Sequence, residues 1–123
     1  MGTPQLFNTV SDDFIGFHKG GIKNVVTFLN FHNKDVSKAT GQTVKSIRYD
    51  ERMPQELKER LEEIGNLINL TAGFFHGDLD KTTLWFNTKN PLLGDMSPKE
   101  MIAYGRYEKL RKFILNAISG IKP

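Results

Sequence analysis

The sequence predicts an all-α protein. Apolar residues recur at steps of three and four between residues 54 and 75, which places them on one face of a long helix. Shorter segments on both sides show the same spacing, and glycine or proline separates them. No segment alternates apolar and polar residues as a half-buried strand does. With 123 residues, the chain is long enough for one compact domain or for two small helical subdomains that share a core.

Two short helices are predicted near the start of the chain. Ser11 is a suitable N-cap for the first, which the glycine pair at residues 20–21 ends. The second covers residues 22–31, where the apolar side chains again fall on one face. Both are short enough to depend on tertiary packing for their stability.

Residues 35–47 have the layout of a helix-turn-helix. Asn33 caps its first helix, Gly41 supplies the turn, and Thr43 caps a further helix through Ile47. In this motif the last helix presents its first turn to the major groove of DNA. We therefore expect contacts to bases or phosphates from the following residues: Lys34, Lys38, Gln42, Thr43, Lys45, Ser46 and Arg48.

The charge distribution agrees with this interpretation without deciding it. From His18 to Arg52 there are seven lysines and arginines against three acidic residues, whereas the whole chain has a net charge of +3. A local basic excess is typical of a surface that binds phosphates. It is equally typical of a solvated basic face. DNA binding and a purely structural role therefore both remain open for this segment.

Four helices are predicted in the rest of the chain. The long helix covers residues 54–75, and the next runs from its cap at Asp78 to Phe86. A short helix covers residues 98–104, and the last covers residues 107–120. The fold class is thus a helix-turn-helix-like bundle, then a long helix, then a group of C-terminal helices.

A non-helical bend is predicted between the helix that ends at Phe86 and the helix that begins at Pro98, in the sequence N-P-L-L-G-D-M. Pro91 disfavours the helical conformation at Asn90, which precedes it, and Gly94 permits a positive φ. The bend should therefore be rigid. Its apolar residues are expected to be buried beneath it: Leu92, Leu93 and Met96.

The sequence S-P-K-E that follows predicts a helix start. The Ser97 side chain can accept a hydrogen bond from the backbone N–H of Glu100, and the Glu100 side chain can reach back to Ser97. Pro98 occupies the first helical position, where its missing N–H is not needed.

Residues that carry chemistry are sparse. The absence of cysteine removes disulfides, thiolate catalysis and cysteine-ligated zinc. His18, His32 and His76 lie in three different segments, and no set of residues suggests a nucleophile with its base and oxyanion donors. We therefore expect no enzymatic activity, no cofactor and no metal. The chain has no apolar run of membrane-spanning length and no signal-peptide layout, so we expect a cytoplasmic protein with no membrane partner.

Three motifs occur in a fixed order after residue 76. They are G-D-L-D-K-T-T-L-W-F at residues 77–86, N-P-L-L-G-D-M-S-P-K-E-M at residues 90–101, and Gly105 followed by a last helix that ends in I-S-G. This series resembles the toxin-binding domain of the MbcA/ParS/Xre antitoxin family, and the upstream helices resemble the Xre-like N-terminal domain of that family. The resemblance implies two domains, residues 1–53 and residues 54–123.

The resemblance also implies a function. It implies a type II antitoxin that occludes the active site of a cognate RES-domain toxin, an enzyme that consumes NAD, and that forms a homodimer and binds its own operator DNA. The residues that it implies for the toxin-binding domain are Trp85, Asn90, Pro91, Leu93, Gly94, Ser97 and Pro98, with Ile121 and Lys122 in a tail that approaches the toxin. The alternative is a stand-alone helix-turn-helix regulator without a toxin partner.

Overall fold

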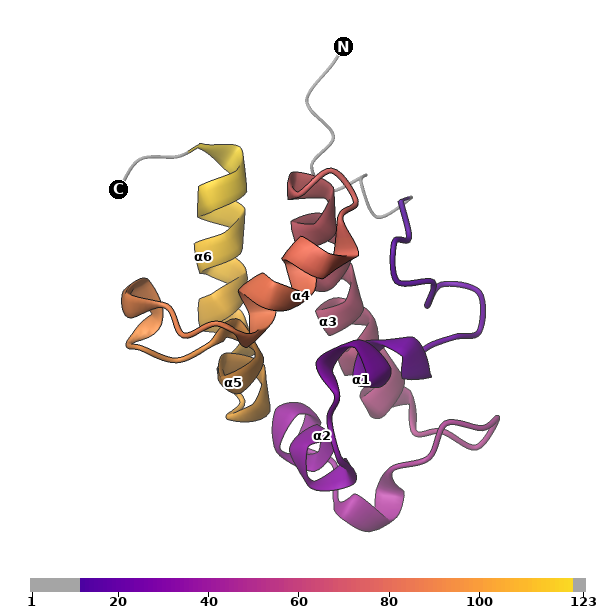
Figure 1. Cartoon of the computed structure of the whole chain (residues 1–123). Coiled ribbons are helices and arrows are strands. Elements are labelled where there is room, and N and C mark those ends of the chain that lie inside the picture. Colours follow the sequence, from indigo (N-terminus) through magenta and orange to yellow (C-terminus); the bar gives the residue numbers. More distant parts are fainter. Residues whose placement is uncertain (1–11, 121–123) are drawn as a thin grey trace.

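A computed structural model describes residues 12–120 of the chain (Figure 1). As predicted, this range is all-helical, with no strand. The elements are α1 (Lys23–Leu29), α2 (Asn33–Thr40), the 3₁₀ turn η2 (Val44–Ser46), α3 (Gln55–Phe74), α4 (Leu79–Asn87), the 3₁₀ turn η3 (Pro91–Leu93), α5 (Pro98–Ala103) and α6 (Tyr107–Ser119). Among residues 12–120, no helix combines the length and the apolar character needed to span a bilayer.

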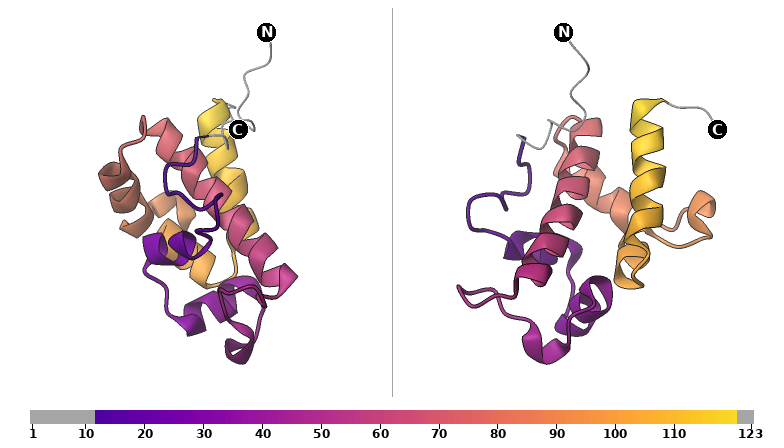
Figure 2. Two further views of the ribbon diagram at one scale, coloured as in Figure 1. Left: turned by 90° about the vertical axis from the view of Figure 1, so that its right-hand side faces the viewer. Right: turned by 180° about the vertical axis from the view of Figure 1, so that it is seen from behind.

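Helix α3 is the central element, as its predicted length suggested. It contacts α1, α2, α4 and α6, and the views in Figure 2 show α6 running alongside it. The Tyr107 hydroxyl donates a hydrogen bond of 3.1 Å to the backbone carbonyl of Glu63, which fixes the start of α6 on α3. The buried face of α3 includes Leu57, Leu61 and Ile64, at the spacing read from the sequence.

One hydrophobic core contains residues from both sides of residue 53. Val25 and Val36 are fully buried in the first part of the chain, and Phe86 and Leu110 are fully buried in the second. The ring of Phe28 meets Phe86 edge to face, with centroids 5.7 Å apart, so that α1 and α4 share one aromatic contact. Helix α2 packs against α5 as well. The two predicted parts are thus joined by continuous packing.

The predicted helix at the start of the chain does not form over the residues described. From Asp12 to Gly21 the chain runs in turns, and Ser11 lies outside the described residues. The Asp13 carboxylate accepts hydrogen bonds from the backbone N–H groups of Gly16 and His18, at 3.0 and 2.8 Å. These bonds compete with helical ones, because a short acidic side chain can satisfy the backbone in a turn.

The side chain of Phe17 explains an unusual glycine in the middle of α3. Phe17 is 3% exposed and lies against Gly65. A Cβ atom at Gly65 would lie 2.5 Å from Phe17 Cε2 and 2.8 Å from Val25 Cγ2. Only glycine therefore allows the segment around Phe17 to approach α3 this closely. The packing gained in this way compensates for the low helix propensity of Gly65.

The prediction of a last helix in the helix-turn-helix is also wrong. Where the sequence predicted a helix capped by Thr43 and containing Val44 and Ile47, only the three-residue turn η2 forms. The Thr43 hydroxyl lies 2.9 Å from the Ser46 hydroxyl and caps no backbone N–H, and Ile47 is already extended. Val44 is 50% exposed, so this segment lacks the apolar anchor that a longer helix needs.

The remaining helix boundaries agree with the sequence to within one or two residues. Helix α2 starts at Asn33, and its N-cap is His32, one residue earlier than predicted. Asp78 caps α4 as predicted, by accepting a hydrogen bond of 3.0 Å from the backbone N–H of Lys81. Gly120 ends α6.

Candidate functional site

The bend between α4 and α5 is held together by Asn90. Its side-chain oxygen accepts a hydrogen bond of 2.9 Å from the backbone N–H of Leu92, and its backbone N–H donates to the carbonyl of Met96 at 3.1 Å. The backbone of Asn90 is extended and Gly94 has a φ of 69°, both as predicted from Pro91 and from the glycine. Asn90 therefore bonds the start of the loop to its end at Met96.

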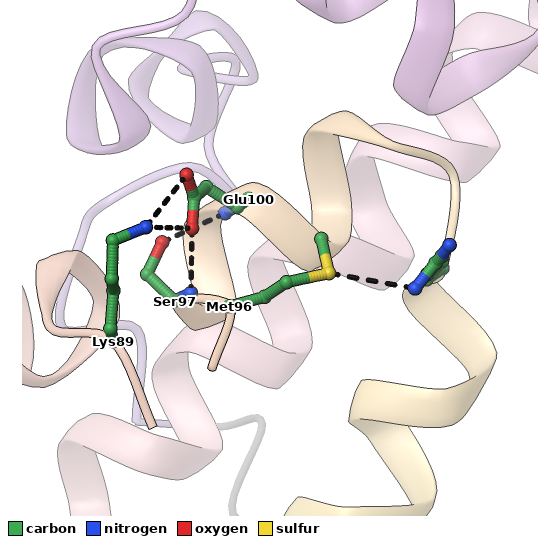
Figure 3. Close-up of polar contacts among 5 residues, drawn as sticks. Lys89, Met96, Ser97 and Glu100 are labelled. Carbon is green, nitrogen blue, oxygen red and sulfur yellow. Dashed lines mark hydrogen bonds and ion pairs between the residues drawn. The ribbon is translucent and has the colours of Figure 1, made fainter. Parts of the chain in front are cut away.

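The predicted helix start after the bend is present in full. Ser97 Oγ accepts from the backbone N–H of Glu100 at 3.1 Å, and Glu100 Oε1 accepts from the backbone N–H of Ser97 at 2.9 Å. Figure 3 shows these bonds, together with the Lys89 ammonium 3.3 Å from Glu100 Oε1. The hydrogen bond from the Ser97 backbone and the nearby Lys89 hold the pKa of Glu100 below its usual value. Pro98 is buried at the first helical position.

The apolar residues of the bend do not all lie beneath it. Leu93 is 8% exposed and Met96 is half-buried, as expected, but Leu92 is 78% exposed. The reason is the 3₁₀ turn at residues 91–93, in which neighbouring side chains point about 120° apart, so that Leu92 and Leu93 cannot face the same side. Figure 1 shows that this bend projects from the helices beside α6. Leu92 is thus exposed to solvent on this bend.

An apolar pocket of about 180 Å³ lies between the C-terminal half of α3, α4 and the C-terminal half of α6. Its lining residues are Thr71, Phe74, Phe75, Trp85, Asn90, Phe113, Ile114, Ala117 and Ile118. The sequence did not reveal this pocket. The signal for it was the pair Phe74-Phe75 at the end of α3, because two consecutive helical residues lie about 100° apart and only one of them can be fully buried. Phe74 is 58% exposed.

Trp85 forms one wall of the pocket. Its side chain is half-buried, and its ring meets Phe86 edge to face at a centroid distance of 5.2 Å. Asn90 lines the pocket as well, so the residue that closes the bend also shapes the cavity. Trp85 and Asn90, two of the residues that the resemblance implies, therefore both line this pocket.

The predicted tail residues lie outside the described part of the chain. Ile121 and Lys122 follow Gly120, the C-cap of α6. Of the α6 residues that line the pocket, Ala117 and Ile118 are the nearest in sequence to this tail.

Several of the predicted DNA-binding residues already have partners within the protein. The guanidinium of Arg48 makes two hydrogen bonds to the Asp50 carboxylate, at 2.8 and 2.6 Å, and these bonds raise the pKa of Arg48 and lower that of Asp50. Gln42 Nε2 donates to Glu56 Oε1 at 3.1 Å. The Lys38 ammonium lies 4.8 Å from the centre of the Tyr104 ring, a cation–π contact between α2 and α5.

The other predicted DNA-binding residues are arranged along one short stretch. Lys34, Thr43 and Lys45 are exposed, and Ser46 is half-buried beside Thr43. Lys34 lies in the first turn of α2, whereas Thr43, Lys45 and Ser46 lie at the single turn η2 instead of on the first turn of an α-helix. A second α-helix for the major groove is missing from this stretch.

Among residues 12–120, no three or more His, Asp or Glu side chains lie together as metal ligands would. Comparison of the chain with protein-family models, with curated proteins and with solved structures gives no match. Exposed apolar features of the C-terminal helices include Leu92 in the bend, Leu84 on α4 and the pocket beside Trp85.

Proposed function

We propose that this protein is an antitoxin that acts in the cytoplasm, binds a cognate RES-type toxin and occludes its active site. The observation that carries the proposal is the apolar pocket between α3, α4 and α6, with the exposed ring of Phe74 on its rim. Apolar recesses lined by aromatic side chains are typical of the centres of protein–protein interfaces.

The rigidity of the bend supports the same proposal. Asn90 and the Ser97–Glu100 capping pair fix the loop through hydrogen bonds before any partner arrives. A preformed loop loses little conformational entropy on binding, so more of its contact energy contributes to affinity. Leu92 is the side chain that this loop holds out to solvent.

The residues that carry the resemblance to the MbcA/ParS/Xre family support it further. Asn90, Gly94 and Ser97 build the bend, and Trp85 forms the wall of the pocket. The residues that carry the resemblance thus lie in the bend and at the pocket, the two features to which this proposal assigns the docking of the toxin.

The proposal is tested by co-expressing the protein with a RES-type toxin encoded by the neighbouring gene. Phe74→Ser and Leu92→Ser should each reduce copurification and restore NAD loss, because central apolar contacts contribute about 2 kcal/mol or more each, roughly 30-fold in affinity. Val44→Ser is the matched control, since Val44 is exposed to a similar degree in a different part of the chain. Full copurification of both pocket and bend variants, or a gene without a RES-type neighbour, would refute the proposal.

For autoregulation, we propose phosphate contacts to operator DNA by a homodimer through Lys34 and Lys45. Both are exposed, whereas Arg48 is already paired with Asp50. Lys45→Ala should therefore weaken binding to the promoter fragment, and lower its salt dependence, more than Arg48→Ala does. In a stand-alone regulator without a toxin partner, the same variants would change DNA binding and Phe74→Ser would change nothing in the toxin assay.

A further inference from the structure

We propose that a second cavity, between the α1–α2 junction, α2 and α5, binds a small aromatic anion of the nucleoside monophosphate class. The cavity measures about 390 Å³, a volume in the range of small-molecule sites, and its lining includes Phe31, Lys38, Lys99 and Tyr104. It shares no residue with the pocket beside Trp85. The inference goes beyond the antitoxin function, because it assigns the protein a small-molecule ligand that toxin binding does not require.

Two lysines bring positive charge to this cavity from two different helices. Lys38 lies on α2 and Lys99 lies on α5, and the two helices are in contact. Among residues 12–120, neither lysine takes part in an ion pair. Both ammonium groups are therefore available to a ligand, and lysine is a common phosphate ligand in proteins.

The two carboxylates in the lining are already engaged. Asp35 accepts a hydrogen bond of 2.9 Å from the backbone N–H of His32, and Glu100 accepts one of 2.9 Å from the backbone N–H of Ser97. The Lys89 ammonium, 3.3 Å from Glu100 Oε1, neutralises this second carboxylate as well. The charge that the cavity offers to a ligand is thus positive.

Two aromatic side chains supply the apolar part of the cavity. Phe31 is half-buried against the hydrophobic core, whereas Tyr104 is 58% exposed. The Lys38 ammonium lies 4.8 Å from the centre of the Tyr104 ring. An anion held by Lys38 is therefore close to an aromatic surface, and nucleobases stack favourably on such side chains. A nucleoside monophosphate carries both the phosphate and the flat ring that this combination selects.

Ala103 keeps the cavity open. It lies four positions after Lys99 on α5, so both residues are on the same face of the helix, and both line the cavity. Ala103 is half-buried, and a longer side chain at this position would extend into the hollow. Filling the cavity at Ala103 can therefore be separated from removing its charge.

Isothermal titration of the full chain with adenosine monophosphate tests the proposal. The nucleotide should bind at least about tenfold more tightly than inorganic phosphate or adenosine, because each of these has only half of the contacts. Lys38→Gln and Lys99→Gln should each weaken binding about tenfold. Lys109→Gln is the matched control, because Lys109 is an exposed lysine on α6 that does not line the cavity, and it should bind like the unchanged protein. Equal binding by all three variants would overturn the proposal.

Ala103→Leu should abolish binding although both lysines remain, with the fold checked by circular dichroism. The unchanged protein gives a measurement that does not depend on any variant: in proton NMR the nucleotide should shift the ring signals of Tyr104 and Phe31 and leave the Trp85 indole unshifted. Absence of these shifts, or phosphate that binds as tightly as the nucleotide, overturns the proposal. A single-stranded oligonucleotide that bound more tightly through the same residues would also overturn it, because the ligand would then be nucleic acid. None of these outcomes involves a toxin, so they are independent of the antitoxin proposal.

Discussion

Replacement of Gly65 by alanine should destabilise the protein even though alanine is the better helix former. A methyl group at this position would lie 2.5 and 2.7 Å from two ring carbons of Phe17 and 2.8 Å from Val25 Cγ2. Carbon atoms in contact prefer about 3.5–4.0 Å, so the neighbours must move by roughly 1 Å. Phe17 and Val25 are 3% and 0% exposed, and neither can turn into solvent.

The size of the effect follows from two opposing contributions. Added volume in a packed core costs about 1–3 kcal/mol, and the upper half of that range applies where both neighbours are enclosed. Glycine to alanine in a helix interior contributes about 1 kcal/mol in the other direction. The free energy of unfolding should therefore fall by about 1–2 kcal/mol, and Tm by roughly 4–10 °C for a chain of this size.

Thermal unfolding followed by circular dichroism measures this effect, and the same helix provides the control. A Cβ atom at Gly73 would lie 3.7 Å from Phe14 Cε2, which is an ordinary contact. Gly73→Ala should therefore leave Tm unchanged or raise it. If Gly65→Ala were as stable as the unchanged protein, the close approach of Phe17 to α3 would be refuted.

Two further predictions concern the capping pair and Tyr107. Ser97→Ala removes the acceptor for the Glu100 N–H and should lower the free energy of unfolding by about 1 kcal/mol in a urea titration, whereas Ser119→Ala, on an exposed hydroxyl, should not. Because the folded-state pKa of Glu100 is below its ordinary value of 4.5, its stabilising contribution is complete above that pH and is lost as the pH falls further; Glu100→Gln should flatten the acid side of the Tm–pH curve. Burial raises the pKa of Tyr107 to about 12, so stability should fall as the pH rises above 10.0, where an unfolded tyrosine ionises; Tyr107→Phe should reduce that loss.

The features that the sequence predicted well are those set by local chemistry. Asp78 and Ser97 cap helices because a short polar side chain can reach the next free N–H groups, and this depends only on nearby residues. The same is true of the extended backbone before Pro91. The helix α3 was equally predictable, because the apolar spacing of one helical face repeats over several turns of its 20 residues.

The features that the sequence did not predict depend on distant partners. The turns at residues 12–21 combine local bonds to the Asp13 carboxylate with a bond from Asn69, a residue 56 positions away. Thr43 had a plausible capping pattern, yet Val44 after it remains exposed and only Ile47 packs against the core. The pocket beside Trp85 exists only because α3, α4 and α6 converge, which no short motif specifies.

The packing that crosses residue 53 matters to anyone who would dissect the protein into halves. A fragment that begins at Pro54 would leave the face of α3 that packs on α1 and α2 without its partners, and such a surface invites aggregation. The complementary fragment would keep α-helices of only 7 and 8 residues, which are too short to persist in water alone. Binding assays on separated halves would thus report misfolding, and each activity is better assigned by single substitutions in the intact chain.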